Sequence, residues 1–493
     1  MTNSPDYSRK WFVLAAVGMG IFLVTIDGTI VNVALPTLVR ELNTDFATVQ
    51  WVVLGYLLTL STLLLSVGRL GDMVGKKPVY ITGFVLFTLS SLLCGLAPTV
   101  YWLIGFRVLQ AVGAAMAQAL GTAIVTEAFP DSERGKALGM AGTLVSIGVV
   151  LGPTLGGLLI EALSWHWIFL VNLPVGVIGV WMVIRYVPNL QPTGEQRFDY
   201  VGAAVLFIGL LTLLLGLTLG QQWGFDDQRV WLMLAGALLL IGLFIGIEAQ
   251  TRQPMIDLRL FRNQLFSINL ITGLMVFIAV AGVFILLPFY LEGVLGYGPR
   301  AVGLLVAAVP ILLGVTAPIS GSLSDRYGTR LIASIGLAVL AGGYWAMSRF
   351  TAETNLTYYL IAVLPFGAGM GIFQSPNNSA IMGAVPRAQL GVVSGLLSVN
   401  RTLGQTTGIA VMGAIWAGRV AARSPDALTG GATTAPAEIQ VAAMQDTFYV
   451  VVGLVALALA VAVWGWWQEQ RRQAAMSEQR PPTKGDANQY LEA

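Results

Sequence analysis

The chain has 493 residues, of which 56% are hydrophobic and only 11% are charged, whereas about a quarter of the residues in a soluble domain carry a charge. A net charge of +2 excludes a strongly basic surface for nucleic acid, and one cysteine and one histidine exclude a disulfide framework and a multi-histidine metal site. The surplus of apolar side chains must face something other than water, and lipid accounts for it best.

The first apolar run, residues 11–35, follows a short polar segment, residues 1–10. It is too long for a signal-peptide core and lacks a small-residue cleavage site, so we expect a retained transmembrane helix. Further runs have the length of about 18–25 residues that a helix needs to cross a bilayer. They cover residues 50–68, 79–97, 100–125, 137–160, 166–187, 199–220, 230–248, 266–290, 300–321, 331–349, 357–382, 391–417 and 447–467. Because the runs are continuous rather than alternating, they predict an all-α polytopic membrane protein with 14 transmembrane helices and not a barrel.

The distribution of basic residues predicts the orientation. With the N-terminus inside, 19 of the 27 lysines and arginines lie on the cytoplasmic side, six lie outside, and two, Arg107 and Arg401, lie within spans. This excess predicts an even number of spans with both termini in the cytoplasm. Two stretches are predicted to lie outside the membrane: a flexible or loosely folded extracytoplasmic loop, residues 418–446, and a disordered cytoplasmic tail, residues 468–493.

The loop after the second span is repeated after the tenth. GRLGDMVGKK, residues 68–77, and GSLSDRYGTR, residues 321–330, share the pattern G-x-L-x-D-x-x-G followed by basic residues. The repeat predicts two six-helix bundles, residues 11–187 and 266–467, joined by a linker, residues 188–265, that carries two extra transmembrane helices. Transporters with two related halves bind their substrate near the midplane where the halves meet.

Two charges lie deep within spans of the first half. An aspartate at bilayer depth costs roughly 2.5–3.5 kcal/mol on insertion scales. Asp27 is therefore either a structural carboxylate bonded to a neighbouring helix or a site that takes up a proton, with Thr25 and Thr29 sharing its hydrogen bonds. The side chain of Arg107 either extends to the membrane–water interface or is buried and needs an anionic or carbonyl partner. We favour the functional interpretation and predict that Asp27 and Arg107 couple the protein to protons.

Other polar side chains within spans either line a cavity or form hydrogen bonds between helices. For Arg401 we expect a carboxylate of the other half, or a substrate anion, as the partner. The predicted cavity residues are Asn32, Tyr56, Gln110, Gln374, Asn377, Asn378, Asn400, Arg401 and Gln405. The residues predicted to be merely interfacial are Glu127, Glu161, Glu292 and His166.

Two further features indicate moving parts. The repeated loops place an aspartate at a cytoplasmic helix end, where it is either part of a reversible latch or a solvated turn. The run GVVLGPTLGG, residues 148–157, provides either tight helix packing or a seam that opens. The predicted gating residues are Gly68, Asp72, Gly75, Lys76, Lys77, Gly152, Pro153, Gly156, Asp325, Arg326 and Arg330.

Several of these segments resemble the signatures of one family. IDGTIVNVALP, residues 26–36, resembles the first-helix signature of the fourteen-helix drug:proton antiporter branch of the major facilitator superfamily. GRLGDMVGKK, GVVLGPTLGG, FRVLQAVGAA (residues 106–115) and WHWIFLVNLPVG (residues 165–176) are similar to further motifs of that family, in the expected order. The resemblance implies the major facilitator fold.

The resemblance also implies roles for particular residues. It makes Asp27 the helix-1 acid, Arg107 the arginine linked to proton transfer and Pro153 the antiporter-motif proline, with Asp72 and Asp325 as gate residues. The departures from the family pattern are Met73 in place of arginine, Ala111 in place of glycine and His166 in place of arginine.

The predicted function is a proton-coupled antiporter of the plasma membrane that exports small amphiphilic compounds or drugs by alternating access. Protonation of Asp27 from outside and substrate binding from inside would compete. Only one carboxylate but two arginines lie mid-span, so the expected cargo is neutral, zwitterionic, monocationic or lipid-like. We expect a monomer in the lipid bilayer, driven by the proton gradient, with no cofactor, metal or nucleic acid.

Three other classes of protein are weighed against this function. A narrow-specificity metabolite or lipid exporter of the same fold is the alternative. A membrane enzyme would need a cluster of catalytic residues, which the sequence lacks. A scaffold or sensor without transport would not need so many polar residues within its spans.

Overall fold

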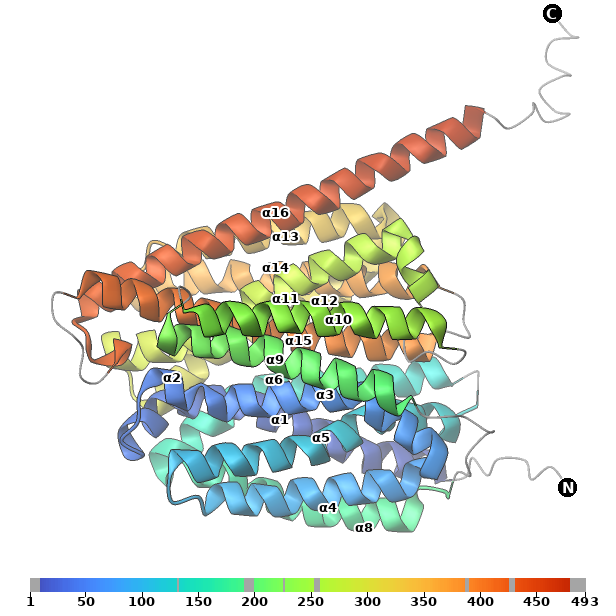
Figure 1. The fold of residues 1–493 in the computed structure, drawn as a ribbon, viewed down its shortest axis with the longest axis horizontal. Coiled ribbons are helices and arrows are strands. Elements are labelled where there is room, and N and C mark those ends of the chain that lie inside the picture. The colour runs from blue at the N-terminus through green and yellow to red at the C-terminus, as the bar shows by residue number, and fades with distance from the viewer. Residues whose placement is uncertain are drawn as a thin grey trace, which may run out of the picture.

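The computed structural model describes residues 9–130, 133–189, 199–224, 227–251, 258–385, 390–424 and 431–478. In these ranges the regular elements are helices that run alongside one another (Figure 1). Thirteen of the described helices are long and apolar enough to cross a membrane. The 34-residue helix α15 (Leu390–Arg423) lies among them but is not one of these thirteen. The predicted all-α polytopic fold is confirmed.

Along the chain, the helices are grouped into a first half, an inserted pair and a second half. The first half consists of α1 (Lys10–Glu41), α2 (Phe46–Val49), α3 (Trp51–Val74), α4 (Lys76–Gly95), α5 (Val100–Ala128), α6 (Arg134–Ala162), α7 (Trp167–Leu170) and α8 (Asn172–Tyr186). The inserted pair is α9 (Tyr200–Trp223) and α10 (Gln228–Gln250). The second half consists of η2 (Leu258–Arg262), α11 (Gln264–Phe289), η3 (Tyr290–Val294), α12 (Pro299–Tyr327), α13 (Thr329–Met347), α14 (Leu356–Gly383), α15, η5 (Ala432–Thr434) and α16 (Ala437–Glu478).

The bundle has two ends that differ in what they carry. The end where α1 begins and α16 finishes, on the right in Figure 1, is called the terminal face. The opposite end, where α1 finishes and α16 begins, is called the far face. The predicted orientation would put the terminal face in the cytoplasm.

The repeated loops adopt the same backbone conformation. Helix α3 is followed directly by Gly75, with φ 104° and ψ 136°, and helix α12 by Gly328, with φ 89° and ψ 142°. Glycine adopts positive φ without the steric penalty of other residues. In each half the next helix begins at the following residue. The sequence repeat thus marks the same turn in both halves.

The hydrophobic core joins the two halves at the far face. One cluster of buried side chains runs from the second half of α1 and the start of α3 into α11, α12 and α15. Towards the terminal face the core divides. One cluster belongs to α1, α3, α4 and α5, with Val399 of α15 packed on it. A smaller one lies between η2, α11, α14 and α15. The halves are therefore held together chiefly at the far face.

The inserted pair touches both halves. Helix α9 packs against α3 of the first half and α15 of the second, and α10 packs on α9. Leu403 of α15 contacts the small apolar cluster that α9 and α10 form. The pair therefore closes one flank of the boundary between the halves.

Two predictions about polar stretches need correction. In the predicted loop, residues 418–446, α15 continues to Arg423 and α16 begins at Ala437. In the predicted disordered tail, residues 468–493, α16 continues to Glu478 and projects beyond the other helices (Figure 1). Ala, Arg, Gln and Glu are good helix formers, so a helix that has already begun propagates through these polar segments. Residues 425–430 and 479–493 lie outside the described part of the chain.

Candidate functional site

Asp27 and Arg107 form an ion pair inside the first half. The Nη1 atom of Arg107, on α5, lies 2.5 Å from Oδ2 of Asp27, on α1. The relative exposure of the two side chains is 1% and 0%. The sequence predicted a buried acid and a buried cation but did not predict that they bind each other.

Three polar side chains complete the shell of the carboxylate. Gln110 of α5 donates to Oδ1 of Asp27 at 2.9 Å, and Asn172 of α8 donates to the same oxygen at 3.1 Å. Gln110 also accepts from Arg107 at 2.7 Å and donates to Ser91 of α4 at 2.7 Å. Every donor to Asp27 therefore comes from the first half, so the carboxylate is enclosed there and does not face the second half.

Arg107 is also held by groups other than the carboxylate. Its Nε donates to the carbonyl of Val52 at 3.1 Å, and its guanidinium carbon lies 4.0 Å from the ring centroid of Tyr56. Phe169 lies on it at 5.7 Å. A cation over an aromatic face gains about 0.5–2 kcal/mol when it is desolvated. Tyr56 and Gln110, predicted to line a cavity, are fully buried around this pair instead.

The hydrogen bonds expected from Thr25 and Thr29 are not formed. Each hydroxyl donates to a carbonyl of its own helix, at 2.7 Å to Ile21 and at 3.1 Å to Thr25. Threonine in a helix readily makes this bond to the preceding turn. Gln110 and Asn172 donate to the carboxylate instead, and Ser91 accepts a hydrogen bond from each of these two amides. Asn172 lies in the motif WHWIFLVNLPVG, so the sequence signal that could have identified it is this motif.

Asn172 provides the first test of this shell. Asn172→Ala removes one donor to Asp27, and we expect the protein to lose about 1 kcal/mol of stability. Asn172→Asp places a second carboxylate beside Asp27 and should destabilise it more, with a deficit that shrinks as the pH falls because one of the two carboxyl groups then binds a proton. Thermal unfolding of the purified protein in detergent between pH 5 and 8 measures both effects. Equal stability of Asn172→Asp and the parent at pH 8 would contradict the assigned contact.

The other face of α1 is open. Gly28 follows Asp27 directly, and a Cβ added to it would meet no atom within 4 Å. Asn32 lies about 40° further round the helix and is partly exposed. The two faces of this segment thus differ: Asp27 points into the first half, and Gly28 and Asn32 point to free space.

The predicted cavity residues of α14 and α15 fall into two groups. Asn377 and Asn400 are buried inside the second half, where a Cβ on Gly273 of α11 would lie 3.3 Å from the amide nitrogen of each. Asn400 donates to the carbonyl of Leu270 on α11 at 3.1 Å, which is a hydrogen bond between helices of the same half. The second group is partly exposed and comprises Gln374, Asn378, Arg401 and Gln405.

The glycine run of α6 makes two seams. Gly148, Gly152 and Gly156 face α1, and a Cβ on Gly156 would lie 2.9 Å from Cγ1 of Ile30. The next residue, Gly157, faces α12 instead, where its Cβ would strike the carbonyl of Pro299. Small residues let helix backbones approach closely. The motif therefore packs α6 on α1 within the first half and on α12 of the second half.

Charged groups join the halves beside this second seam. Arg40, at the end of α1, forms an ion pair with Glu292, which lies in the π-helical turn η3 and whose side chain is only 5% exposed. Glu161 of α6 accepts from the backbone N–H of Arg300 at 3.2 Å. Glu292 was predicted to be a simple interfacial residue; a π-turn, which often marks functional sites, buries it against the other half.

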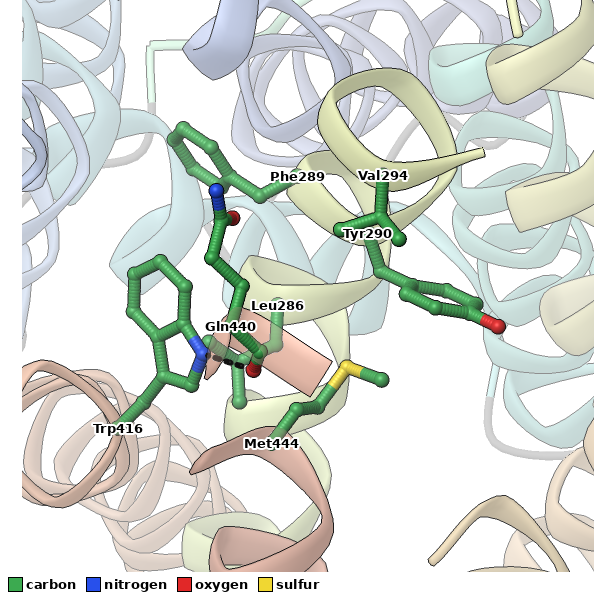
Figure 2. Close-up of a pocket in the computed structure, with 7 residues that line it drawn as sticks. All are labelled: Leu286, Phe289, Tyr290, Val294, Trp416, Gln440 and Met444. Carbon is green, nitrogen blue, oxygen red and sulfur yellow. Dashed lines mark hydrogen bonds between the residues drawn. The ribbon is translucent and has the colours of Figure 1, made fainter. Parts of the chain in front are cut away.

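Aromatic side chains seal the same face. Phe46 of α2 packs with ring centroids 4.9 Å from Phe289 and 4.7 Å from Trp416 of the second half. Figure 2 shows the small pocket behind these rings, where the indole N–H of Trp416 donates to the carbonyl of Gln440. The residues lining this pocket belong to the second half and include none of the predicted cavity residues.

The predicted gating residues at the terminal face make contacts within their own halves. Lys76 forms an ion pair with Glu127, Lys77 donates to the carbonyl of Ile184 at 3.0 Å, and Arg330 donates to the carbonyl of Gly465. Asp325 and Arg326 are exposed. The side chain of Asp72 lies outside the described part of the structure.

These features define a class of protein. Two related helical halves share a hydrophobic core at the far face and enclose a charged pair next to an open face of a central helix. This arrangement is typical of membrane transporters that are built from two related halves. Residues 17–409 match the model of the Major Facilitator Superfamily, and the chain belongs to that family.

Similar proteins extend this assignment. The chain is 35% identical over 410 residues to the riboflavin transporter RibZ of Clostridioides difficile, covering 83% of this chain and 89% of that protein. It is 34% identical to the multidrug resistance protein Stp of Mycobacterium tuberculosis, covering 82% and 75%. It is 30% identical to a tetracenomycin C resistance and export protein of Streptomyces glaucescens, covering 85% and 78%. A crystal structure of a bacterial homologue of the human lysosomal transporter Spinster has the same fold, with a TM-score of 0.65, 16% identity and 94% and 98% coverage.

Proposed function

We propose that this transporter exports small amphiphilic compounds across the plasma membrane in exchange for protons, with the terminal face in the cytoplasm. The observation that carries the proposal is the enclosed Asp27–Arg107 pair on α1 and α5. Three of the relatives bear names of multidrug resistance or antibiotic export proteins, which supports cargo of this kind.

A proton on Asp27 would upset the site as it stands. The neutral carboxyl group would leave Arg107 without its counter-charge, and an uncompensated buried charge costs about 3–5 kcal/mol. The added hydrogen would also point at donors, because Arg107, Gln110 and Asn172 all donate to this carboxylate. Protonation therefore favours a different arrangement of α1 and α5.

A shift of α1 on protonation can be transmitted to the far face through helix packing. Helix α1 packs on the glycines of α6, and α6 packs on α12 through Gly157 and Pro153. A shift of α1 would move α6 and so strain the seam that closes the far face. A proton that enters down a membrane potential contributes about 2.3 kcal/mol per 100 mV.

The test is a flux measurement in proteoliposomes that contain a pH-sensitive dye. Adding a transported compound should change the internal pH, and a protonophore should remove accumulation of the compound. Compound flux at the same rate with and without a proton gradient would overturn the exchange mechanism.

A second candidate function is transport of one metabolite. The riboflavin transporter that is 35% identical favours it. A panel of dyes, antibiotics and vitamins, including riboflavin, separates the two: a multidrug exporter moves several unrelated compounds, and a metabolite transporter moves one.

A further inference from the structure

Helix α15 turns Arg401 towards the space between the halves. The positions at 400, 404 and 408 face α11, since Asn400 bonds to Leu270 and a Cβ on Gly404 would lie 2.6 Å from Cβ of Phe277. Gly413 faces α3, where its Cβ would lie 2.6 Å from the amide of Gln50.

These contacts fix the directions in which the other side chains of α15 point. At about 100° per residue, Arg401 and Gln405 lie between the side that faces α11 and the side that faces α3. Leu403, on the other side of the helix, packs against the cluster of α9 and α10. Arg401 and Gln405 therefore point away from the inserted pair and into the boundary of the two halves. Both side chains are only partly exposed.

Arg401 has no counter-charge. Among the residues that the structure describes, no hydrogen bond and no ion pair joins it to another group. Two buried carboxylates already have cationic partners: Asp27 forms an ion pair with Arg107, and Glu292 forms one with Arg40. The carboxylate of the other half that the sequence predicted for Arg401 is not found. An arginine at this depth is costly unless an anion or a polar group pairs with it.

We propose that Arg401, with Gln405 one turn further on, binds the anionic group of the transported compound. The guanidinium offers a planar pair of N–H donors that fits a carboxylate, and the Gln405 amide supplies a further donor. The cargo is then an amphiphile with a carboxylate or a similar planar oxyanion. This narrows the predicted range of cargo, and it rests on the proposed export function.

The test uses two probes of the same shape, a xanthene dye with a free carboxylate and its methyl ester. Equilibrium binding is measured on purified protein in nanodiscs of zwitterionic lipid. The parent should bind the carboxylate at least tenfold more tightly than the ester. Arg401→Gln should remove that preference and leave ester binding within twofold, and Arg401→Lys should restore part of it. Arg349→Gln is the matched control. Arg349 is exposed and lies just after the end of α13, so this variant should bind both probes as the parent does.

Three results would overturn the proposal: equal binding of both probes by the parent, equal loss of both in Arg401→Gln, or displacement of the carboxylate by anionic phospholipid, which would assign the site to a headgroup. Binding is independent of proton coupling. Carboxylate binding without proton-linked flux would therefore refute the exchange mechanism alone, and flux without charge preference would refute the anion site alone.

Discussion

Asp27→Asn is expected to abolish proton-driven transport. The amide has nearly the shape of the carboxyl group but takes up no proton in this pH range, so compound flux should become independent of the proton gradient. Proton flux in the dye-loaded proteoliposomes should fall to the level of protein-free vesicles. Unchanged proton flux in this variant would remove Asp27 from the mechanism.

A loss of function in one variant of an ion pair has a second explanation, which is misfolding. Asp27→Asn leaves the charge of Arg107 alone, and Arg107→Gln leaves the charge of Asp27 alone, so each should cost about 3–5 kcal/mol of stability. The double variant Asp27→Asn/Arg107→Gln removes both charges and keeps groups that hydrogen-bond. We expect it to recover most of the stability, measured by thermal unfolding, and none of the proton coupling. Recovery of transport together with stability would reduce the pair to a structural role.

Gly157→Val is expected to hold the far face open. Its Cβ would strike the carbonyl of Pro299 and lie 3.1 Å from the Cα of Arg300, and backbone cannot move aside as a flexible side chain can. The halves must then part at α6 and α12. Spin labels at the exposed residues Asn43 and Glu353, one in each half, should move apart in Gly157→Val, and transport should be lost.

The same helix supplies the control for this variant. Gly142 lies on α6, and a Cβ there would meet no atom within 4 Å. Gly142→Val should leave both the label distance and transport unchanged. Arg40→Ala removes the ion pair to Glu292 and a hydrogen bond to Thr37 of the same helix, but leaves the backbone seam intact, so it should widen the distance less. An unchanged label distance in Gly157→Val would show that this seam does not hold the halves together.

The sequence predicts the helices and the repeat because both are local properties. Length and hydropathy locate spans, and the two GxLxDxxG loops return in the structure as matching glycine turns at Gly75 and Gly328. It also picks out Asp27, Arg107 and Arg401, since a charge within an apolar run is conspicuous in any chain.

The partners of these charges are not local. Which side of α5 meets α1 depends on how whole helices rotate and tilt, so the Asp27–Arg107 bond could not be read from spacing. Ser91 and Asn172 looked ordinary because one serine or asparagine costs little within a span. The ion pair of Glu292 with Arg40 is equally non-local, because it joins the π-turn at Tyr290–Val294 to the end of α1, and hydropathy carries no sign of such a turn.

The inserted pair imposes a limit on how the molecule can open. Helix α9 is in contact with α3 and α15 at once, so the two halves cannot separate on that flank without losing packing against it. The opposite flank carries no such brace in the described structure. We therefore expect the halves to open asymmetrically. The wider entrance should form on the flank remote from α9, and a lipid-soluble compound should enter more easily from the membrane on that flank.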